Sequence, residues 1–156
     1  MRVITILATA VVAWAAAITT AGATADTQTI HFSDLVESDI ISDCNGQGSF
    51  TETLVSDGVM HTTQLPDGTY HFTVTAQGTD TLVPSDPSLP TYTGHFAFWD
   101  GDNITKTTDI STFTESVNLK GTDGSQLHFA VVLHAAMGLD GDHPTVQFAH
   151  SHCIQR

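Results

Sequence analysis

Basic side chains are almost absent from this chain of 156 residues, in which four Lys and Arg stand against 17 Asp and Glu. The formal net charge is -13. A protein that binds DNA or RNA phosphates without regard to sequence needs a basic face, so this function is excluded. The same deficit argues against docking on anionic lipid. The length favours a single domain.

Known catalytic motifs are missing as well. The chain has no G-x-S-x-G elbow, no H-E-x-x-H, no phosphate-binding glycine loop and no dinucleotide fingerprint. Carboxylates are so numerous that Glu52 with Glu115 is one of many conceivable acid/base pairs. Both lie in the middle of expected strands, where we predict outward positions in contact with solvent. The catalytic residues, if there are any, stay unknown, and a binding protein is favoured over an enzyme.

The only long hydrophobic run lies at the start of the chain. It follows Arg2, extends over residues 3–18 and gives way to small residues that end in Ala23-Thr24-Ala25. A positive start, an apolar segment and an A-x-A cleavage site form the pattern of a secretory signal peptide. We therefore predict that residues 1–25 are removed and that residues 26–156 form one secreted, extracellular domain without a membrane span. An uncleaved membrane anchor is the alternative, for which the run is short.

Cysteine is scarce, and both copies, Cys44 and Cys153, follow the predicted cleavage point. In an exported protein two cysteines most simply form one disulfide. It would close a loop of about 110 residues and stabilise the fold by roughly 4–5 kcal/mol. A free thiol that acts as a nucleophile or metal ligand is the alternative, which an oxidising compartment disfavours.

Strands and tight turns dominate what remains. Five Asp-Gly pairs, at positions 57, 67, 100, 123 and 140, are typical of hairpins, because both residues tolerate positive φ. Between them, Thr, Val, Phe and Tyr alternate with polar residues as in half-buried strands. The segments expected to form strands are Thr29–Ser33, Ser49–Val55, Val59–Leu65, Thr69–Ala76, Tyr92–Trp99, Ile110–Lys120, Ser125–His134 and Thr145–Cys153. Asp34–Ile41 is expected to form a turn of helix at most.

About eight strands joined mainly by short turns predict an antiparallel sheet. In up-and-down order such a sheet can close into a β-barrel, which removes unpaired edges. A β-sandwich is the alternative. The proline-rich stretch Pro84–Pro90 is expected to be a stiff connection, either a plain surface crossover or a loop at the rim of the barrel.

Histidine is unusually frequent, with nine copies. His71, His95, His128 and His134 occupy positions opposite the aromatic and aliphatic face of their strands. If that apolar face is the interior, these histidines lie on the outer wall; if not, they line a lumen. Nine histidines also predict that acidification below about pH 6 reduces the net negative charge and its self-repulsion.

His150 and His152 lie two residues apart on one strand face, about 7 Å from each other, a spacing found in some zinc and copper sites. A third ligand would come from a neighbouring strand, with His128, His134 or Asp142 as candidates. The candidate metal ligands are therefore His128, His134, His150 and His152. The alternative is that these histidines are ordinary polar residues of a solvated face. No other cofactor is expected.

Several short segments of the mature chain resemble small secreted actinobacterial proteins to which no function is assigned. The resemblance rests on Tyr92-Thr93-Gly94-His95-Phe96, Gly121-Thr122-Asp123-Gly124-Ser125, Leu127-His128-Phe129, Pro66-Asp67-Gly68-Thr69, Thr75-Ala76-Gln77-Gly78, His134 and Cys153. It implies a compact β-barrel, calycin-like or allene-oxide-cyclase-like in outline, and a secreted location. It transfers no catalytic residue.

A closed sheet with an aromatic interior predicts a site for a small apolar ligand at one mouth. The residues expected to line it are Tyr70, Phe72, Phe96, Phe98, Phe129 and Phe148. The alternatives are an isomerase or cyclase acting on a hydrophobic substrate, metal binding by surface histidines, and surface interactions through an apolar stripe of Ala130, Val132 and Ala136.

Overall fold

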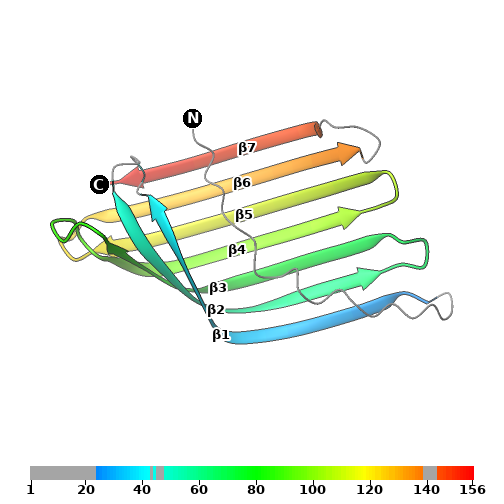
Figure 1. Cartoon of the computed structure of the whole chain (residues 1–156), viewed down its shortest axis with the longest axis horizontal. Coiled ribbons are helices and arrows are strands. Elements are labelled where there is room, and N and C mark those ends of the chain that lie inside the picture. Colours follow the sequence, from blue (N-terminus) through cyan, green and yellow to red (C-terminus); the bar gives the residue numbers. More distant parts are fainter. Residues whose placement is uncertain (1–23, 43, 45–47, 139–143) are drawn as a thin grey trace.

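The computed structural model describes residues 24–42, 44, 48–138 and 144–156. These residues form one antiparallel sheet in which neighbours in sequence are neighbours in space (Figure 1). Its seven strands are β1 (Asp26–Ser42), β2 (Ser49–Gln64), β3 (Tyr70–Pro84), β4 (Tyr92–Ile104), β5 (Thr108–Gly121), β6 (Gln126–Gly138) and β7 (Pro144–Gln155). The predicted signal peptide lies almost entirely outside the described residues, and β1 begins at the residue that follows the predicted cleavage point.

The predicted all-β, up-and-down architecture is confirmed, but two details are wrong. Seven strands form instead of about eight, because Ser49–Val55 and Val59–Leu65, apart from Leu65 itself, belong to the single strand β2, which stays extended through Asp57-Gly58. The sheet is also not closed into a barrel by hydrogen bonds: within the described residues β1 pairs only with β2, and β7 only with β6. The strands form one sheet, so the sandwich alternative does not apply.

A sharp bend divides β1 and β2 into two halves. Residues 34–41, expected to be a turn of helix at most, continue β1 after a bulge between Phe32 and Leu35. Asp34 has a φ of 52° at this bulge, which turns the strand. Beyond the bend the two strands fold back across the sheet toward the C-terminal end of β7 (Figure 1). The curl therefore produces a closed end and leaves the other half of the sheet uncovered by these two strands (Figure 1). We refer to the concave face of this open half as the trough.

A diagonal of glycines permits this curl. Gly58, Gly78 and Gly94 lie on the concave side of β2, β3 and β4. Gly78 is two residues from Ala76, the partner of Gly58, and Gly94 is two residues from Phe96, the partner of Gly78. A Cβ on Gly78 would collide with the backbone carbonyl of Val55, and a Cβ on Gly94 with that of Asn118. Glycine is required here because the neighbouring backbones cross so closely on the inner side.

The hydrophobic core lies in the closed end. Its buried members come from β2 to β6, and they are Phe50, Leu82, Tyr92, Phe96, Val117, Leu119 and Leu127. The rings of Phe50 and Tyr92 meet edge to face, with centroids 6.1 Å apart. The Tyr92 hydroxyl accepts hydrogen bonds from Gln155 Nε2 at 2.8 Å and from Ser125 Oγ at 3.1 Å. Tyr92 thus connects the core to the last strand.

The predicted disulfide between Cys44 and Cys153 is present, with Cα atoms 5.5 Å apart across a sequence separation of 109. Cys44, in the connection between β1 and β2, packs against the core, and Cys153 lies on β7. The bond therefore joins the folded-back first hairpin to the last strand. It links covalently the two ends of the sheet that hydrogen bonds leave unlinked.

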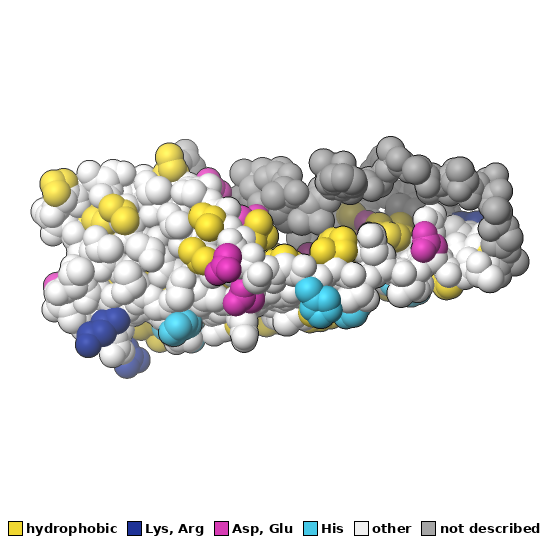
Figure 2. Space-filling view, turned by 90° about the horizontal axis from the view of Figure 1, so that it is seen from below, with side chains coloured by type: hydrophobic (Ala, Val, Ile, Leu, Met, Phe, Trp, Pro, Cys, Tyr) yellow, Lys and Arg dark blue, Asp and Glu magenta, His cyan; other side chains and the backbone are white. Residues whose placement is uncertain are grey.

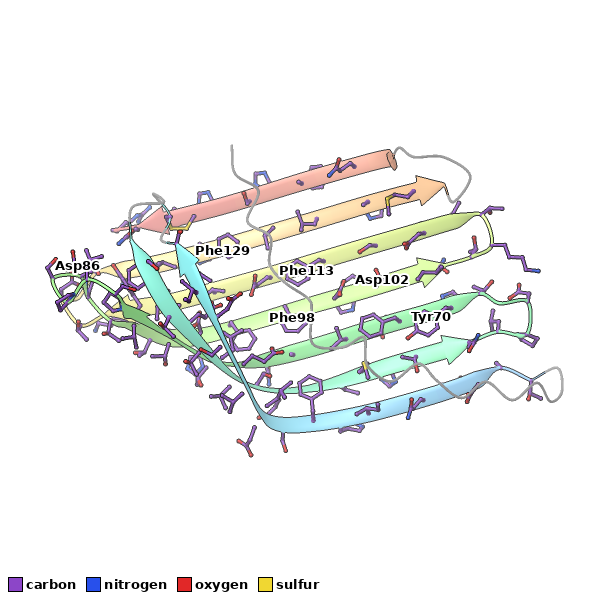
Figure 3. The ribbon with its side chains drawn as sticks, in the orientation of Figure 1. Tyr70, Asp86, Phe98, Asp102, Phe113 and Phe129 are labelled. Carbon is purple, nitrogen blue, oxygen red and sulfur yellow. A yellow bond between two sulfur atoms is a disulfide. The ribbon has the colours of Figure 1, made fainter. Side chains whose placement is uncertain are left out.

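Only some of the Asp-Gly pairs form the predicted turns. Asp67-Gly68 and Asp123-Gly124 do, with φ of 90° and 89° at their glycines. Asp57-Gly58 and Asp100-Gly101 lie inside β2 and β4, and the pair at positions 140–141 lies outside the described residues. The loop between Pro84 and Tyr92 lies at the closed end, since its Asp86 lies far from Tyr70 and Asp102 (Figure 3). In the part of the chain that the structure describes, no helix has the length and apolarity needed to cross a membrane.

Candidate functional site

The concave face of the open half is the candidate site, because aromatic side chains from three strands, β3, β4 and β5, lie on it. Phe98 on β4 stacks against Phe96 at 6.3 Å between ring centroids and lies 6.0 Å from Phe113 of β5. Register places Phe72 and Tyr70 of β3 on the same face, opposite Asp102 and Ile104. Figure 3 shows Phe98 and Phe113 close together, with Phe129 toward the closed end and Asp102 and Tyr70 toward the open end.

The predicted ligand-lining residues separate into three groups. Tyr70, Phe72 and Phe98 lie half-buried on the concave face. Phe96 is buried in the closed-end core, and Phe129 packs against that core. Phe148 is 54% exposed and pairs with His134 on the convex face, so the structure does not bring it to the others.

Phe113 was missed by sequence reasoning, although the signal was present. Along β5 three of the odd positions, Phe113, Val117 and Leu119, are apolar, and the even positions between them are polar. Glu115 occupies an odd position too. The alternation that identifies Phe113 as concave therefore also places a carboxylate on that face.

Three carboxyl groups meet where the closed-end core gives way to the open half. Glu52 lies on β2, Asp80 on β3 and Glu115 on β5, and charge repulsion acts between Glu52 and each of the other two. Asp80 is only 1% exposed, and its Oδ1 atom has no hydrogen-bond partner. We refer to Glu52, Asp80 and Glu115 as the carboxyl cluster.

Burial is the main cause of unusual acidity in this cluster. Desolvation, reinforced by the neighbouring carboxylates, raises the pKa of Asp80 to about 7 and the pKa of Glu115 to about 7. The pKa of Glu52 is raised as well, first by burial and then by Asp39. The cluster therefore retains protons near neutral pH and can both donate and accept hydrogen bonds.

The prediction that Glu52 and Glu115 point outward is wrong. Each shares strand parity with core residues: Glu52 lies between Phe50 and Leu54, and Glu115 pairs directly with Phe98. Among the described residues no Lys or Arg occupies a concave position of a strand. Lys106 lies in the turn between β4 and β5, Lys120 is on the convex face, and Arg156 follows β7. The carboxyl cluster therefore has no basic counterpart on its own face.

Further carboxylates continue along the trough toward the open end. Burial raises the pKa of Asp100, and Asp102 adds repulsion. Burial also raises the pKa of the Tyr70 hydroxyl, again with a contribution from Asp102. The concave face thus combines an apolar floor with acidic groups throughout.

The described histidines lie on the convex face, so the outer-wall alternative holds for His71, His95, His128 and His134. His143 lies outside the described residues. His134 Nδ1 is 2.7 Å from Thr112 Oγ1, and His128 Nδ1 is 2.7 Å from Asn118 Oδ1, both across the β5–β6 pair. His95 Nδ1 approaches the Gly78 carbonyl at 3.3 Å. In Figure 2, seen from below, histidine side chains follow the lower side of the molecule. The alternative of a histidine-lined lumen is therefore wrong.

The four candidate metal ligands are only partly brought together. The rings of His128 and His152 lie 6.3 Å apart, centroid to centroid. His150 pairs with Val132, and His134 lies further along β6 opposite Phe148, so neither joins them. Within the described ranges no three His, Cys, Asp or Glu side chains are arranged to hold a metal ion. Asp142 lies outside those ranges.

The convex face also exposes a few large apolar side chains. Trp99 and Val132 are each 38% exposed, and they flank Thr114 of β5 in one cross-strand row. Phe148 lies one row away on β7. The predicted stripe of Ala130, Val132 and Ala136 does share this face, with Val132 as its most exposed large member.

Comparison of the chain with protein-family models, with curated proteins and with solved structures finds no match. The site therefore has to be interpreted from its own geometry.

Proposed function

We propose that this protein is a secreted binding protein that holds a small, largely apolar ligand against the concave face of its open half. The observation that carries the proposal is the exposure of large apolar side chains on that face. Ile30 is 39% exposed, Leu133 40% and Met137 44%, and Leu133 pairs directly with Phe113, whose half-buried ring lies next to that of Phe98. Apolar surface gathered on a concave face with a few polar groups is typical of small-molecule sites.

The disulfide supports secretion, and together with the closed-end core it supports ligand binding by a rigid sheet. The Cys44–Cys153 disulfide is consistent with an oxidising, extracellular environment. The same bond and the closed-end core stiffen one half of the curled sheet. A rigid scaffold of this kind limits the ordering cost when a ligand binds to the other half.

The experiment is titration with the uncharged fluorescent probe N-phenyl-1-naphthylamine. Leu133→Ser should weaken binding of the probe about tenfold, because it removes an apolar contact from the concave floor. Val132→Ser is the matched control, since Val132 is the adjacent residue on the convex face and is exposed to nearly the same extent, 38% against 40%. Absence of probe binding to the unmodified protein, or equal loss in both variants, would refute the proposal.

A second candidate function, acid–base catalysis on an apolar substrate, is favoured by the carboxyl cluster. A carboxyl with a pKa of about 7 beside aromatic rings, as Glu115 has, is suited to move a proton at neutral pH. Glu115 would remove a proton from the carbon next to a ketone and return one to it. The test uses 2-tetralone in heavy water. NMR measures the rate at which deuterium replaces hydrogen on the carbons next to its ketone. The protein should accelerate the exchange and Glu115→Gln should not; a rate equal to that in buffer would rule this candidate out.

Surface interaction remains the competing binding mode, supported by the exposure of Trp99, Val132 and Phe148 on the convex face. It predicts self-association or capture of a partner through that face. Sedimentation of the protein and of Trp99→Ser checks this, because a monomer unaffected by the substitution leaves the face without such a role.

A further inference from the structure

The carboxyl cluster lies at the inner end of the trough in which the proposed apolar ligand would bind. Glu115 pairs directly with Phe98, whose ring packs against those of Phe96 and Phe113. Glu52 reaches the same place from the folded-back half of β2. A ligand that lies on the aromatic floor would therefore have its inner end beside two half-buried carboxyls.

Asp80 provides a second, independent observation at this point. Its side chain is 1% exposed, yet Oδ1 makes no hydrogen bond. A buried polar atom without a partner is costly, and native proteins usually satisfy it with a protein group, a water molecule or a ligand. Its nearest charged neighbours, Glu52 and Glu115, are acceptors when ionised and repel it.

No positive group of the described chain can neutralise this cluster. On the concave face the titratable groups near it are Glu37 and Asp39 from β1, Glu52 itself from β2, Asp100 from β4 and Glu115 from β5, all of them acidic. The described concave positions of β6 and β7 carry no titratable side chain other than the disulfide-bonded Cys153. Among the described residues, therefore, none supplies a positive charge at this site.

We propose that the ligand of the trough is an organic cation, namely an amine or ammonium group carried on an apolar body, with the cationic group between Glu52 and Glu115. This inference rests on the proposed binding function and specifies its ligand class. A cationic head would interact with the carboxylates and with the faces of Phe98 and Phe113, while the apolar body covers the floor of the trough. A bare metal ion fits less well, because no three donors of the described residues converge on one point.

Proton release follows from this arrangement. The raised pKa values of Asp80 and Glu115 mean that the cluster is partly protonated at neutral pH. A bound cation favours the ionised carboxylates, so binding should release protons and should strengthen as the pH rises from about 6 to about 8. A neutral ligand would do neither.

The experiment compares dodecylamine with dodecanol, which share one apolar body, as competitors of N-phenyl-1-naphthylamine at about pH 8. Dodecylamine should displace the probe at a concentration about tenfold lower. The Glu52→Gln/Glu115→Gln variant should remove this preference and leave the dodecanol affinity unchanged. Asp67→Asn/Asp86→Asn is the matched control, since it removes the same number of charges from exposed loops.

Calorimetry of the unmodified protein in two buffers of different ionisation enthalpy gives a readout that needs no variant. Binding of dodecylamine near pH 7 should release protons from the protein, and binding of dodecanol should not. Equal affinity for the two ligands, amine binding without proton release, or a preference that the loop control loses as well would overturn this inference. Binding of both ligands with equal affinity would leave the proposed function standing, whereas binding of neither would refute the function itself.

Discussion

Asp57 accepts a hydrogen bond from the backbone N–H of Asp34, with 2.9 Å between the amide nitrogen and Oδ1. Asp34 is the residue with positive φ at the bulge of β1. Asp57 belongs to β2, and it precedes Gly58, over which the ring of Phe32 lies. The pair therefore holds the two strands together at the bend that folds them across the sheet.

Replacement of Asp57 by Ala should lower the free energy of unfolding by about 1–2 kcal/mol, because it leaves the Asp34 amide without its partner. Asp57→Asn keeps an acceptor oxygen and should cost less. Urea unfolding followed by tryptophan fluorescence measures both variants. Equal stability of the Ala and Asn variants would show that the hydrogen bond does not hold the bend.

The same residue explains why one feature of the fold was not predictable from local sequence. Asp57-Gly58 and Asp67-Gly68 are the same dipeptide, but only the second forms a turn. At Gly58 a long-range contact, the ring of Phe32 packed on the glycine, replaces the local preference for a hairpin. A pattern read over a few residues predicts strands and antiparallel order, but not which glycines serve close packing.

Gly94→Ala tests that close packing. Its Cβ would meet the backbone carbonyl of Asn118, which cannot move without shifting β5, so a loss of about 2–3 kcal/mol is expected. Gly138→Ala is the control, since its nearest neighbour, the Thr107 carbonyl, lies at an ordinary 3.9 Å. It should change the stability by less than about 0.5 kcal/mol. A similar small effect at both positions would contradict the role given to the glycine diagonal.

The carboxyl cluster was predictable in part. Glu52, Asp80 and Glu115 each occupy an apolar-parity position, since Phe50, Leu82 and Val117 lie two residues away on the same face. Strict use of alternation would have placed all three inward, against the general preference of carboxylates for solvent. That they converge could not be predicted, because it depends on how far the sheet curls.

Loss of the Cys44–Cys153 bond should destabilise the protein by about 4–5 kcal/mol, the value expected for a loop of 109 residues. Cys44→Ser, Cys153→Ser and the double variant should be equally affected, because each removes the same bond. Denaturant unfolding with and without a reducing agent measures the effect. The reducing agent should weaken only the unmodified protein; a reductant effect on the double variant would point to another cause.

Stability should fall as the pH rises from about 4 to about 7 and then level off. Asp80 and Glu115 have a pKa of about 7 in the folded protein, above the ordinary values of 3.8 and 4.5. The unfolded chain therefore releases these protons first, and the stabilisation present at low pH is lost as the pH approaches the folded-state value. Between about pH 5.5 and pH 7.5 the loss should be on the order of 2 kcal/mol.

Thermal and urea unfolding over this pH range separate the carboxyl cluster from the histidines, whose protonation also reduces the net negative charge. Glu115→Gln should remove about half of the pH dependence, because Asp80 still titrates, and should raise the stability at about pH 7.5, because the neutral amide avoids both desolvation and repulsion by Glu52. Asp86→Asn, on an exposed loop, should leave the profile unchanged. If Glu115→Gln retains the full dependence, Glu115 does not contribute to it, and the pKa assigned to this carboxyl is wrong.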